Sequence, residues 1–169
     1  MRFLVLIPIV YAAAVLETSL VDVLRIGNVT PDLLALTAIV WLLFANGPRA
    51  FLAAGAIALV GDPIAPGRLG VGMGWMLLVG YGVSQLRARV KCDHLVGQLT
   101  VTWAAVTIWA TGVGLTGRLL GEVAMPASTI LARAVGVGCY TAGVALPLLL
   151  AIGWIGEPLL PRKRRPAPF

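Results

Sequence analysis

Almost the whole chain consists of apolar runs separated by short polar breaks, and this pattern most limits what it can fold into. Of the 169 residues, 59% are hydrophobic and only 12% are charged, whereas an ordinary soluble domain has about 45 to 50% apolar and about 25% charged residues. A chain with so few polar residues lacks the material for a water-facing surface around a separate core. We therefore predict an all-α, polytopic membrane protein.

Six apolar segments are candidate spans of a single transmembrane helical bundle at residues 1–160, which a basic tail follows at residues 161–169. They are Phe3–Leu24, Pro31–Ala45, Pro48–Gly61, Leu69–Leu86, Leu95–Leu120 and Ser128–Ile155. A helix needs about 20 residues to cross a hydrocarbon core about 30 Å thick. The second and third segments are shorter than that, so they are expected either to cross a thin part of the bilayer or to form a re-entrant hairpin. Both readings put the two termini on one side.

Basic residues indicate which side that is, because short cytoplasmic loops are enriched in Lys and Arg. With both termini inside, nine of the thirteen basic residues fall on the inner face, and four arginines lie outside or near the outer end of a span. The nine are Arg2, Arg49, Arg87, Arg89, Lys91, Arg162, Lys163, Arg164 and Arg165; the four are Arg25, Arg68, Arg118 and Arg133. We therefore predict cytoplasmic termini, and we interpret the net charge of +6 as a product of topology rather than of nucleic-acid binding.

Acidic residues gather at the opposite face. Five of the seven acids are predicted at or near the outer ends of spans: Glu17, Asp22, Asp32, Asp62 and Glu122. Ionisable groups at membrane depth are costly unless they are paired or hydrated, so they tend to mark a site or an interface. The outer half of the bundle is therefore predicted to be a zone of mixed charge.

Two of these acids have local structural explanations. Thr30 is a suitable N-cap and Pro31 a suitable first helical residue, which places Asp32 in the first turn, near the positive end of the helix dipole. Asp62 follows the third segment, and Pro63 prevents the helix from continuing. Asp62 is then either part of the polar zone or only a hydrated turn residue.

No set of residues in the sequence suggests an enzyme, a metal site or a cofactor. His94 is the only histidine, and Cys92 and His94 lie too close in one loop to converge on a substrate with Asp93. Cys139 lies inside the last apolar segment, away from Cys92, so neither a disulfide nor a zinc site is expected. We predict a non-enzymatic protein without a cofactor.

Residues 30–81, "TPDLLALTAIVWLLFANGPRAFLAAGAIALVGDPIAPGRLGVGMGWMLLVGY", resemble the central signature of the bacterial rod shape-determining protein MreD family. The shared pattern is a Pro-Asp-Leu-Leu that opens a short span, a tight turn with glycine, a second short span that ends in Gly-Asp, and a long span. The resemblance covers about a third of the chain, and the length and the order of spans agree with it.

The resemblance implies a scaffold in the cytoplasmic (inner) membrane that helps to control cell shape through peptidoglycan synthesis. Its expected partner is an MreC-like protein with one span, and a RodA-like glycosyltransferase with a class B penicillin-binding protein is expected to be linked indirectly. Carried over to this sequence, Asp32 and Asp62 match the two acids of the signature, with a structural role. The bilayer is the remaining partner.

A small-molecule binder is the alternative. The predicted layout is similar to that of the six-helix substrate-binding subunits of energy-coupling vitamin transporters, in which a polar outer half would hold the ligand. Those subunits dock through small residues spaced by four on the first helix, whereas this chain places Ala12, Ala13 and Ala14 in a row. A similar fold alone does not decide between the two functions.

Glu17 and Arg133 are expected at similar depths below the outer ends of the first and last spans, at about 10 and about 8 Å. One hypothesis is that they form an ion pair, with both residues serving the structure or the binding of a partner. In the other, Arg133 extends outward to the lipid headgroups, and Glu17 is neutral or faces water.

The topology leads to a first prediction. In intact cells, a membrane-impermeant thiol reagent is expected to leave Cys92 unmodified, because the loop at residues 87–94 should face the cytoplasm. Single cysteines introduced at Arg25, Arg68 or Glu122 should react from outside. Modification of Cys92 in unbroken cells would overturn the topology, and labelling after lysis is the control for its reactivity.

Overall fold

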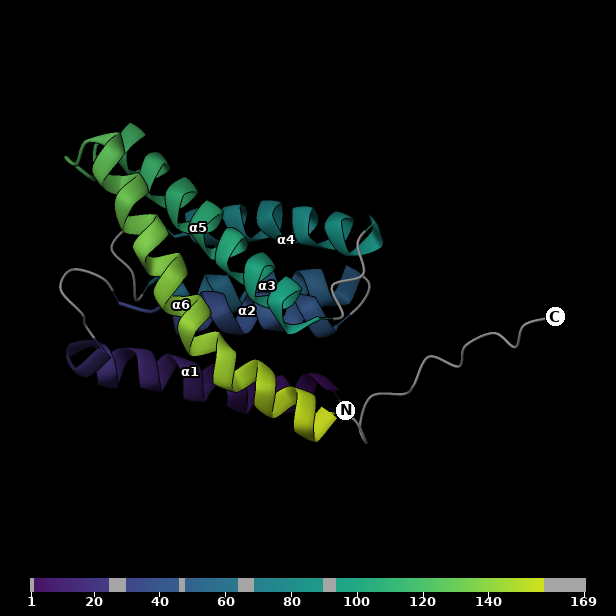
Figure 1. The fold of residues 1–169 in the computed structure, drawn as a ribbon. Coiled ribbons are helices and arrows are strands. Elements are labelled where there is room, and N and C mark those ends of the chain that lie inside the picture. Colours follow the sequence, from purple (N-terminus) through teal and green to yellow (C-terminus); the bar gives the residue numbers. More distant parts are fainter. Residues whose placement is uncertain (1, 25–29, 46–47, 64–68, 90–93, 157–169) are drawn as a thin grey trace.

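The computed structural model describes residues 2–24, 30–45, 48–63, 69–89 and 94–156, and these form helices joined by short turns and loops, with no strand among them (Figure 1). The helices are α1 (Arg2–Leu24), α2 (Leu33–Phe44), α3 (Pro48–Gly61), α4 (Val71–Arg89), α5 (Leu95–Leu119) and α6 (Ala127–Gly156). The all-α prediction is confirmed for these residues. Each helix begins and ends within three residues of the first and last residues of the segment predicted for it.

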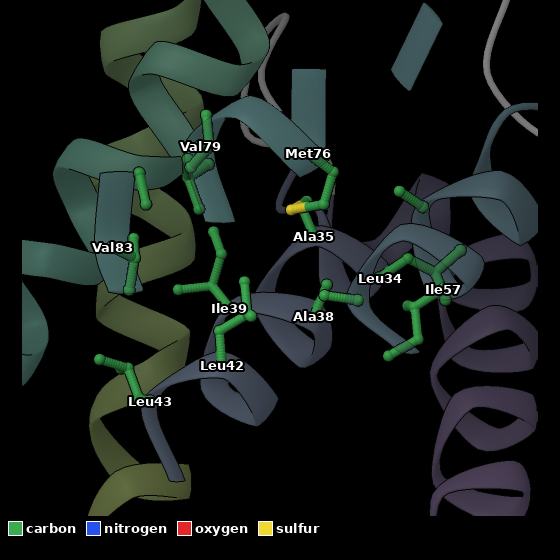
Figure 2. Packing of buried hydrophobic residues seen from close by; sticks show 14 of the residues in the cluster. Leu34, Ala35, Ala38, Ile39, Leu42, Leu43, Ile57, Met76, Val79 and Val83 are labelled. Atoms are coloured by element: carbon green, nitrogen blue, oxygen red, sulfur yellow. The ribbon is translucent and has the colours of Figure 1, made fainter. Parts of the chain in front are cut away.

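The short helix α2 is the centre of the fold. It packs against all five of the other helices, and eight of its twelve residues are buried. In Figure 1 it lies between α1 and α4. Figure 2 shows Ile39 and Leu42 of α2 beside Val79 and Val83 of α4, and Ile39 is completely buried. An apolar helix enclosed in this way has no amphipathic pattern to orient it, because every side faces other side chains.

Helices α5 and α6 form a long antiparallel hairpin that crosses the other helices obliquely (Figure 1). Glycines let this hairpin pack closely. A Cβ atom on Gly112 of α5 would overlap the ring of Trp75 from α4, and one on Gly138 of α6 would overlap the Oγ1 atom of Thr107 on α5. Both contacts therefore depend on the absence of a side chain, as at close helix crossings in membrane proteins.

Two helical stretches among the described residues, Leu95–Leu119 and Ala127–Ala151, are long and apolar enough to cross a membrane. Only 28% of the most apolar window in each is buried, so much of the apolar surface of both helices is left uncovered by the rest of the described chain. By contrast, the 12 residues of α2 span about 18 Å, which confirms that the second predicted segment is too short for a full crossing of a bilayer of ordinary thickness.

Two glycines of α6 provide a matched test of this packing. We expect Gly138→Ala to destabilise the protein by about 1 to 3 kcal/mol, because the added methyl group overpacks the contact with Thr107. Gly143 has open space around its Cβ position, so Gly143→Ala should be neutral or stabilising by up to about 1 kcal/mol through helix propensity. Thermal unfolding of the purified protein in mild detergent measures both. Equal effects of the two substitutions would contradict the close packing of the hairpin.

Candidate functional site

The N-terminus of α2 is capped by its own preceding residue, Asp32. This residue has extended backbone angles (φ −97°, ψ 97°), and its Oδ1 atom accepts a hydrogen bond of 2.6 Å from the amide of Ala35. The prediction that Thr30 is the N-cap and that Asp32 lies in the first turn is wrong. The N-cap lies two residues later than expected, because the short side chain of Asp32 can accept from the free amide of Ala35, the third helical residue.

Two other helices bond to the same end of α2. The Oε2 atom of Glu17 in α1 accepts a hydrogen bond of 3.0 Å from the amide of Leu34. The amide of Asp32 itself donates to the hydroxyl oxygen of Thr141 in α6, at 3.2 Å, and Thr141 is completely buried. The amides of Asp32, Leu34 and Ala35 at the start of α2 are thus bonded to side chains of α6, of α1 and of the N-cap residue itself.

The two carboxylates at this end lie close enough to interact with each other. They accept from the adjacent amides of Leu34 and Ala35, so the two side chains lie near each other, and two ionised carboxylates placed in this way would repel each other. The positive end of the α2 dipole and the amide hydrogens oppose that repulsion. In this arrangement both acids bind backbone amides at one end of α2.

At the C-terminus of α2 a basic side chain, that of Arg87, bonds the backbone carbonyl oxygens. Arg87 of α4 donates from one guanidinium nitrogen to the carbonyl oxygens of Leu42 and Ala45, at 2.6 and 3.1 Å. These carbonyls belong to the last turn and the C-cap, where a helix leaves acceptors without partners. Arg87 was predicted only as one of the inner basic residues. Its contact with α2 was missed because no local pattern links the two segments.

Asp62, just after α3, is a buried capping residue rather than a hydrated turn residue. It is 9% exposed, and its Oδ2 atom accepts a hydrogen bond of 2.5 Å from the amide of Gly70, directly before α4. Its Oδ1 atom lies where a Cβ of Gly72 would be, and the indole of Trp109 donates to the Gly72 carbonyl oxygen at 3.1 Å. Asp62 thereby joins the end of α3 to the start of α4.

The ion pair between Glu17 and Arg133 does not form in the structure. Among the described residues, α1 and α6 make no close contact with each other, whereas α6 packs along α5 and also contacts α2. The carboxylate of Glu17 is bonded to α2, and the side chain of Arg133 is exposed on the surface of α6. The ion-pair hypothesis is therefore wrong. The exposure of Arg133 is compatible with the alternative, but Glu17 is bonded to α2 rather than facing water.

The remaining sequence-derived candidates are placed only in part. His94 precedes α5 without a capping hydrogen bond from its side chain, and the Sγ atom of Cys139 accepts from the indole of Trp103 at 3.2 Å. Within the described ranges, no group of three or more His, Cys, Asp or Glu residues could hold a metal ion. Arg25, Arg68, Cys92 and the basic tail at residues 161–169 lie outside the described residues.

Comparisons of this chain with protein-family models, with curated proteins and with solved structures gave no match. The site is therefore defined by its own geometry. It consists of the two capped ends of α2 and the capped start of α4, with Glu17, Asp32, Asp62 and Arg87 as the charged groups. Each of these groups binds peptide groups of the chain itself, which is an architecture suited to holding a fold in place.

The N-cap leads to a specific prediction. Asp32→Ala should lower the free energy of unfolding by about 0.5 to 2 kcal/mol, because the amide of Ala35 loses its acceptor. Asp32→Asn retains an acceptor oxygen and should lie within a few tenths of a kcal/mol of wild type. Thermal unfolding in mild detergent compares the three proteins. If Asp32→Asn is as unstable as Asp32→Ala, capping by the side-chain oxygen is not the role of this residue.

A double-mutant cycle tests the separation of Glu17 from Arg133. Glu17→Ala should cost about 1 to 3 kcal/mol, because the amide of Leu34 is left without an acceptor, whereas Arg133→Ala should stay within about 0.5 kcal/mol of wild type. The double mutant should equal the sum of the two within about 0.5 kcal/mol. A coupling energy above about 1 kcal/mol would restore the ion pair and contradict the structure.

Proposed function

We propose that this chain is a multi-pass membrane protein that acts as a non-enzymatic scaffold of the bacterial cell-elongation machinery. Support for the membrane comes first from the surface. Large apolar side chains are exposed on the outer helices: Tyr11 on α1, Leu52 on α3, Leu78 on α4, Ile108 on α5 and Leu131 on α6. A soluble monomer rarely exposes so much apolar surface, whereas lipid tails solvate it well.

The capped ends of α2 are the observation that carries the membrane assignment. A helix of about 18 Å placed across a hydrocarbon core of about 30 Å leaves at least one of its ends at a depth without water. Peptide groups left without a hydrogen-bond partner there would destabilise the protein. Side chains at both ends of α2 supply the missing hydrogen bonds, so a central helix too short to span is compatible with lipid on all sides of the bundle.

The scaffold role rests on the resemblance of residues 30–81 to the MreD family, and the positions of its two acids support that role. Asp32 caps α2 and Asp62 caps the start of α4, so the signature residues secure helix ends within the bundle. Both carboxylates accept hydrogen bonds from backbone amides of the chain. On this proposal the chain acts through its surface, by binding other membrane proteins.

The proposed location is the inner membrane, with six spans and both termini in the cytoplasm. The direct partner is an MreC-like protein with one transmembrane span. Through this partner the chain is linked to a RodA-like glycosyltransferase and a class B penicillin-binding protein, and so to the control of cell shape by peptidoglycan synthesis. The other four helices would complete the spans, with α2 and α3 as the short central pair. Three of these four contain shorter apolar stretches: Ile7–Ser19, Leu33–Phe44 and Ala50–Gly61.

Co-purification tests the partner. The affinity-tagged full chain, extracted from its own membranes in mild detergent, is expected to retain the MreC-like protein of the same bacterium through extensive washing. An equally tagged, unrelated six-span protein from the same membranes is the control. Depletion of the chain should turn rod-shaped cells round, and the wild-type gene supplied separately should restore the rod shape.

Vitamin binding without a retained membrane partner is the result that would contradict the scaffold proposal. If the purified chain binds a vitamin with a Kd in the micromolar range or below, and no one-span protein is retained, the scaffold proposal is wrong and a transporter subunit is the better assignment. Binding is measured by titration calorimetry with the protein in detergent. The Asp32→Asn variant, which should keep the fold, distinguishes a ligand held at the capped end of α2 from one bound elsewhere.

A further inference from the structure

No further inference is drawn: the strongest candidate, the exposed face of α4 on which Gly74 and Gly82 have open space beside their Cβ positions, is a stripe of small residues, and nothing in the structure shows what covers it.

Discussion

The need to hydrogen-bond the peptide groups at both ends of α2 governs the rest of this structure. A helix leaves four amides at its start and four carbonyls at its end without partners inside the helix. In a long surface helix water supplies those partners, but α2 is short and enclosed by the other helices. Side chains must therefore supply the hydrogen-bond partners of these peptide groups. The carboxylates of Glu17 and Asp32 serve the positive end, and the guanidinium of Arg87 serves the negative end, so charge and hydrogen bonding favour the same orientation of the helix.

Because the capping groups come from different helices, they also fix the positions of those helices. Glu17 attaches α1 to the start of α2, Thr141 attaches α6 to the same place, and Arg87 attaches α4 to the other end. The apolar contacts around Ile39 and Met76 then fill the space between them (Figure 2). Apolar packing by itself is tolerant of sliding and rotation, whereas a hydrogen bond to one backbone amide is not. The polar contacts therefore define the register of a bundle that is held together mainly by apolar surface.

The helices themselves could be predicted from the sequence, but their neighbours could not. Apolar runs bounded by Gly, Pro and charged residues gave six helices in nearly the correct places, because such boundaries act locally. The positions of Asp32 and Asp62 near helix boundaries were also predictable from the neighbouring Pro and Gly, but the capping role of Asp32 was assigned to Thr30 instead. The partner of Glu17 was not, because it depends on which helices touch, and apolar sequences contain little information about order around a bundle. Thr141 and Arg87 were missed for the same reason, since their contacts join residues far apart in the chain.

The sequence separations of the α2 caps have a consequence for how the protein is made. Asp32 caps its own helix, and Glu17 precedes the amide that it binds by only 17 residues, so the start of α2 can be capped as soon as it leaves the ribosome. Arg87 follows Leu42 by 45 residues, and Thr141 follows Asp32 by 109. The end of α2 therefore stays without this partner until α4 is synthesised. During that interval its carbonyls need another hydrogen-bond donor, so the contact with Arg87 can form only after α4 has been made.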